Sequence, residues 1–97
     1  MTIGEVTERQ TADFCGVSID EEAEQAELLK ICGKAAAAFI KGYTGLDDEG
    51  INKHEDLTTA YLVLVNEMYT KRDHTVDSAN INPIVKQILS MHSVNYL

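Results

Sequence analysis

The sequence is poor in the residues that build disulfides, metal sites and membrane spans. Its 97 residues include two cysteines, one proline and no tryptophan. Cys15 and Cys32 are too few and too far apart for a zinc site or a redox motif, so we expect two small buried apolar side chains. No apolar run approaches the roughly 18 residues that cross a bilayer, so we expect no membrane segment. The first residues lack the basic and apolar regions of a signal peptide, which predicts a protein made in the cytoplasm.

Patterns of catalytic and ligand-binding residues are also lacking. His54, His74 and His92 lie in three separate segments, so we expect surface or packing roles for them rather than a metal site. Residues 47–50, Asp-Asp-Glu-Gly, lack the alternating ligands and the terminal glutamate of a calcium-binding loop. No phosphate-binding loop, nucleophile elbow or Cys–His signature is present. We therefore expect no metal and no cofactor, and a small enzyme is the weakest of the functional readings.

Basic side chains are scarce as well. The chain has 16 acidic and 8 basic residues, a formal net charge of −8. Residues 1–56 hold 13 of the acidic and 5 of the basic side chains, so the whole excess lies there. A surface of this sign repels phosphate backbones, and no candidate recognition helix is basic, which argues against a helix-turn-helix DNA-binding protein. The plainest interpretation is a solvated acidic surface.

What is present suffices for one small all-α domain of about four helices, spanning residues 1–97. Thr7 and Gln10 have the spacing of a capping box and predict a short first helix that Gly16 ends. We expect Val6 and Phe14 to turn inward from this helix.

A long second helix is predicted next. Either Ser18 or Asp20 is its cap, and Gly42 or Gly45 is its end. Six apolar residues at steps of three and four predict its buried side: Leu28, Ile31, Cys32, Ala35, Ala38 and Phe39.

A third helix is predicted from about residue 53 to 72, after a polar loop at residues 46–53 in which Asn52 and Glu55 have cap-like spacing. Residues 60–65 are apolar all round, which predicts a helix enclosed on all sides. It is either the central element of the domain or a helix with one face against another subunit. Tyr61 and Leu62 are therefore candidate assembly contacts. A polar loop follows at residues 73–81.

The last segment begins with a strong start signal, an asparagine cap at Asn82 followed by the only proline at the first helical position. Apolar residues then recur at helical spacing, and the sequence still has apolar surface to bury at residues 94–97. Four residues of this segment are candidate assembly contacts: Ile84, Ile88, Tyr96 and Leu97.

Three stretches carry a resemblance to a known family. Residues 38–45 end the long helix, residues 65–72 close the apolar helix, and residues 82–97 form the last helix with its apolar end. In this order, after a short helix that ends near residues 14–17, they resemble the head–tail connector family of tailed bacteriophages and prophages. The resemblance covers essentially the whole chain, and its motifs are patterns of helix packing.

The resemblance implies a structural protein of the virion, made in the bacterial host. It implies a homo-oligomeric ring of about twelve copies beneath the portal protein. Such a ring extends the DNA channel and docks neck or tail-completion proteins, while DNA passes through without specific binding. An acidic channel wall suits this role because it repels the phosphates. The alternative is a small acidic helical regulator of a prophage, which binds one host or phage protein and stays monomeric or dimeric.

Overall fold

The computed structural model describes residues 2–17, 23–71 and 82–92. All regular structure in these residues is helical, which confirms the predicted all-α fold with four longer helices. The elements are η1 (Ile3–Glu5, a 3-10 helix), α1 (Glu8–Cys15), α2 (Ala23–Thr44), α3 (Asp48–Ile51), α4 (Asp56–Lys71) and α5 (Pro83–Met91). The predicted caps Ser18 and Asp20, the loop at residues 73–81, His74 and residues 94–97 lie outside the described residues.

Helix α1 begins and ends where the sequence predicts. The Thr7 hydroxyl accepts a hydrogen bond from the Gln10 amide, the Gln10 side chain accepts one from the Thr7 amide, and Gly16 ends the helix with a left-handed φ of 72°. The inward orientation of Phe14 was wrong, because its side chain is 49% exposed. Thr11 and Ala12 face the core, and Phe14 follows Ala12 at an angle that takes it to the outer side of the helix.

Helix α2 buries a different side from the one predicted. Ile31 is 51% exposed and Ala38 is exposed, and of the six predicted residues only Cys32 is fully buried. The buried residues at steps of three and four are Leu29, Cys32, Ala36, Ile40 and Thr44. Apolar residues occur on several sides of this helix, so packing against α4 decides which side is enclosed. Gly45, at φ 78°, ends α2, whereas Gly42 lies within it.

The predicted polar loop after α2 contains the short helix α3, so the loop prediction was wrong for residues 48–51. Asp47 caps α3 by accepting a hydrogen bond from the Gly50 amide at 2.8 Å. Asn52 follows α3 and does not cap the next helix. Its side-chain oxygen accepts a 2.7 Å hydrogen bond from the Gly4 amide and so ties η1 to this turn. Helix α4 consequently begins at Asp56, later than predicted.

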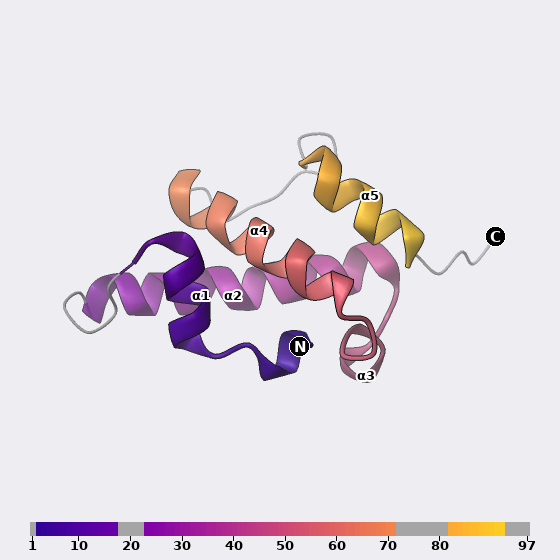
Figure 1. Ribbon diagram of the computed structural model, residues 1–97, viewed down its shortest axis with the longest axis horizontal. Coiled ribbons are helices and arrows are strands. Elements are labelled where there is room, and N and C mark those ends of the chain that lie inside the picture. Colours follow the sequence, from indigo (N-terminus) through magenta and orange to yellow (C-terminus); the bar gives the residue numbers. More distant parts are fainter. Residues whose placement is uncertain (1, 18–22, 72–81, 93–97) are drawn as a thin grey trace.

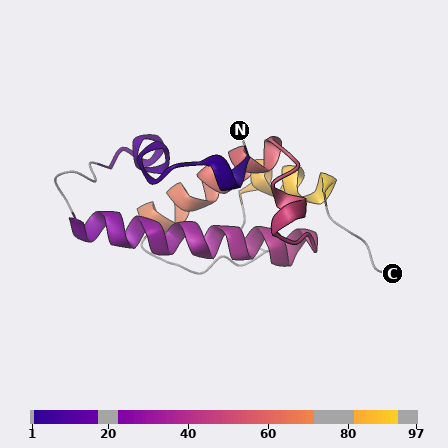
Figure 2. The ribbon, with the colours of Figure 1, turned by 90° about the horizontal axis from the view of Figure 1, so that it is seen from below.

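Helix α4 is the central element. It contacts α2, α5, α1 and η1, and its residues Ala60, Leu64 and Val65 are fully buried. Figure 1 shows α1 and α5 on opposite sides of α4, and Figure 2 shows α2 as a layer that the other helices cover from one side. Although α4 is apolar all round at its centre, neither it nor any other helix in the described part of the chain is both long and apolar enough to cross a membrane.

Candidate assembly surface

Helix α5 carries an apolar surface that is exposed at both of its ends. Four large apolar side chains are exposed among the described residues, and two of them, Ile84 at 64% and Met91 at 65%, belong to α5. Ile84, Ile88 and Met91 are spaced by four and three residues and therefore lie along one side of the helix. We call these three residues the α5 stripe. Val85 and Leu89, on another side of α5, are fully buried in the core.

The helix that carries the α5 stripe is held firmly at its start. The Asn82 side chain accepts a 2.8 Å hydrogen bond from the Ile84 amide, and Pro83 occupies the first helical turn, as the sequence predicts. The Asn82 amide group also donates a 2.9 Å hydrogen bond to the Glu67 carboxylate on α4. These contacts fix the first turn of α5 against α4.

The other end of α5 is held by a cluster of two histidines and an aspartate. The Nε2 atom of His92 lies 2.7 Å from the Asp56 carboxylate at the start of α4. The rings of His54 and His92 pack at a centroid distance of 4.2 Å. No pattern in the sequence predicts that these two histidines meet. No group of three or more ligating side chains in the described ranges could hold a metal ion. Because the cluster joins the end of α5 to the start of α4, we call it the clasp.

Because of the clasp, we expect part of the stability of the fold to be lost in acid. Partial burial raises the pKa of Asp56, but the hydrogen bond and charge of His92, with a smaller effect of His54, bring that pKa below its usual value. A carboxylate with a lowered pKa in the folded state stabilises the fold above its unfolded pKa, about 3.9, and the stabilisation is lost as the pH falls through the folded pKa.

We therefore expect Asp56→Asn to lose less stability than the wild type when the pH falls from about 5 to about 2. Thermal unfolding followed by circular dichroism at a series of pH values measures this. Asp13→Asn, which removes an exposed carboxylate on α1, is the control and should follow the wild-type profile. Equal acid losses in the wild type and Asp56→Asn would show that the Asp56–His92 contact does not stabilise the fold.

Charge also distinguishes α5 from the rest of the molecule. Residues 82–92 contain no acidic residue and one basic residue, Lys86, in a chain with a net charge of −8. Two acidic copies, or two acidic proteins, repel each other wherever their carboxylates face one another. The α5 stripe offers apolar contact without that repulsion.

The six candidate contacts predicted from the sequence do not lie together on one surface of the structure. Ile84 lies on the α5 stripe with its side chain exposed, and Ile88 lies there partly buried against the core. Tyr61 is partly buried on α4 and packs against the core, and Leu62 is also partly buried on α4. Both stay predicted assembly contacts. Tyr96 and Leu97 lie outside the described residues.

Met91 belongs to the α5 stripe, although the candidate contacts did not include it. The signal was present in the sequence, because Met91 stands seven residues, or two helical turns, after Ile84. The apolar residues at helical spacing in this helix include Ile84 and Ile88 as well as Val85 and Leu89, but the core fully buries only Val85 and Leu89. The exposed side of α5 becomes distinct only when the buried residues are known.

Comparisons with known proteins add no assignment. The chain matches no protein family, no curated protein and no solved structure. The α5 stripe and the order of the helices are therefore the features from which a function can be inferred.

Proposed function

We propose that the protein is a structural subunit, without enzymatic activity, that assembles as a ring under the portal protein of a phage head–tail connector. The observation that carries the proposal is the α5 stripe. Ile84 and Met91 are about two-thirds exposed on a helix that is fixed at both ends. Exposed apolar side chains on a rigid element are typical of a protein interface.

The energy available from the α5 stripe suits an assembly built from repeated contacts. Covering a fully exposed isoleucine or methionine yields about 1.5–3 kcal/mol, so the stripe supplies a few kcal/mol at each contact. That is too little for one stable pair of subunits, which must offset the loss of translational and rotational freedom. A closed ring on a portal template repeats the contact at every subunit, and each subunit then gains from two neighbours and from the portal.

The acidic surface supports the same proposal. Asp48 and Glu49 on α3 have side chains that are 81% exposed and pair with Lys41 at 2.8 Å and Lys53 at 3.8 Å. Further exposed carboxylates, Glu8, Asp13 and Glu24, lie along α1 and α2. Around a DNA channel such charges repel the phosphates, so the duplex slides through without specific binding. The proposed location is the head–tail junction of the virion, where the ring also docks neck or tail-completion proteins.

Negative-stain imaging and light scattering of the purified protein, alone and mixed with portal protein, test the proposal. We expect rings with a central hole in the mixture, whether or not the free protein is monomeric. A protein that stays monomeric or dimeric and leaves portal particles bare would overturn the connector role and favour the small acidic regulator.

A further inference from the structure

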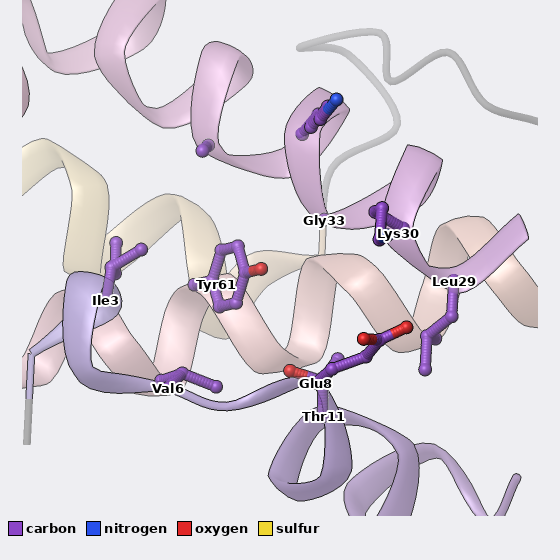
Figure 3. Close-up of a pocket in the computed structure, with 10 residues that line it drawn as sticks. Ile3, Val6, Glu8, Thr11, Leu29, Lys30, Gly33 and Tyr61 are labelled. Carbon is purple, nitrogen blue, oxygen red and sulfur yellow. The ribbon is translucent and has the colours of Figure 1, made fainter. Parts of the chain in front are cut away.

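A pocket lies on the other side of α4 from the α5 stripe, and the proposed ring does not explain it. Its volume is about 320 Å³, and it opens between the η1–α1 segment and α2, with α4 behind. Figure 3 shows the Tyr61 ring rising from α4 between these two walls. The apolar part of the wall consists of Ile3, Val6, Leu29 and Ala37.

A glycine lets the Tyr61 side chain approach α2 closely at this pocket. A Cβ atom at Gly33 would lie 2.7 Å from the Tyr61 hydroxyl oxygen, so a larger residue there would force the hydroxyl to move. Glycine within a helix is less favourable than alanine, and here it permits the close approach. Burial, with a smaller effect of Cys15, raises the pKa of Tyr61 above its usual value despite an opposing hydrogen bond with Thr11. The Tyr61 hydroxyl group lies at the floor of the apolar pocket.

The rim of the pocket is charged, and its basic side is unusual for this chain. Lys30 and Lys34, one turn apart on α2, both line the pocket. Figure 3 shows Glu8 across the pocket on α1. The nearest carboxylate to Lys30 is that of Glu27 at 3.9 Å, and both side chains are more than half exposed, so their pairing is weak. In a protein with twice as many acidic as basic residues, two lysines beside an apolar pocket favour an anionic occupant.

We propose that this pocket receives one large apolar side chain from an acidic segment of another protein, whose carboxylates pair with Lys30 and Lys34. The volume is at the lower end of the range for ligand pockets, about 300–1,000 Å³, and suits a single anchoring side chain. The two lysines at the rim favour acidic residues on either side of the anchoring side chain in the partner.

A second copy of this chain fits the pocket less well. The α5 stripe would bring Lys86 and no carboxylate toward the two lysines. The exposed Phe14 has Asp13 beside it, but inserting it would bring two acidic α1 helices together, each with Glu8 and Asp13. Another protein therefore remains the better partner.

Titration of the isotope-labelled full-length protein with synthetic peptides, followed by amide resonances, tests the proposal. The probes are a short peptide with a central phenylalanine flanked by aspartates, the same peptide with lysines, and the aspartate peptide with alanine at the centre. We expect the first to bind at least tenfold more tightly than either of the others at about 50 mM salt, and to shift the resonances of Gly33 and Ala37. The preference for aspartate should shrink at about 1 M salt.

Variants separate the pocket from the general charge of the surface. Lys30→Glu combined with Lys34→Glu should weaken binding of the aspartate–phenylalanine peptide at least tenfold. Lys86→Glu, on α5 at the far side of α4, should leave it unchanged. Equal affinity for the three peptides, or resonance shifts away from the pocket, would overturn the proposal. The proposal would also be overturned if sodium octanoate bound as tightly as the aspartate–phenylalanine peptide. It would likewise be overturned if the Gly33 resonance shifted when the protein concentration alone was raised. These readouts do not depend on ring formation.

Discussion

Leu64→Ala should lower the free energy of unfolding by about 3 kcal/mol, within the range of about 2–5 kcal/mol for leucine truncations in cores. Leu64 is fully buried at the centre of α4, the helix that α1, α2 and α5 all contact. Alanine leaves a cavity that three neighbouring helices would have to close. For a domain of this size each kcal/mol lowers the midpoint of thermal unfolding by about 4–8 °C, so the drop should exceed about 10 °C.

Urea and thermal unfolding followed by circular dichroism measure this effect. Ile84→Ala is the matched control, because it also removes an aliphatic side chain from a helix but from a position that is 64% exposed. Its free energy of unfolding should change by no more than about 0.5 kcal/mol. If the two variants were equally destabilised, α4 would not be the centre of the core.

The helix ends could be predicted because local chemistry determines them. The capping box of Thr7 and Gln10, the left-handed Gly16 and the Asn82–Pro83 start each depend on a few neighbouring residues, and the structure confirms all three. The short helix α3 was missed because it has a single turn, too short for any periodicity. Its cap at Asp47 is a local signal that the acidic run at residues 47–49 obscures.

The buried faces could be predicted less well, because packing selects among several apolar sides. In α2, Leu28 and Leu29 are adjacent and residues 35–38 are all alanine, so more than one helical stripe fits the sequence. Contact with α4 chooses the side of Leu29. For the same reason, the sequence did not single out Met91 as part of the exposed side of α5. The ring of His54 packs against the ring of His92, which lies 38 positions later in the chain, and no pattern in the sequence predicts this contact.

Replacing both exposed ends of the α5 stripe with aspartate, Ile84→Asp with Met91→Asp, should abolish assembly on the portal while the subunit stays folded. Both side chains are about two-thirds exposed, so the core loses little, whereas an interface formed there would have to bury two carboxylates. We expect at least a hundredfold loss of affinity for the portal, since each unpaired charge in an interface costs several kcal/mol.

Lys86→Glu is the matched control, because it lowers the net charge by the same two units from another exposed position on α5. Sedimentation and negative-stain imaging with portal protein compare the two variants at equal concentration. Lys86→Glu should assemble as the wild type does, which separates the loss of apolar contact from added repulsion. Should both variants lose assembly equally, charge alone would control it. Should both retain it, the interface would lie away from α5, and the apolar ends of this helix would have no part in holding subunits together.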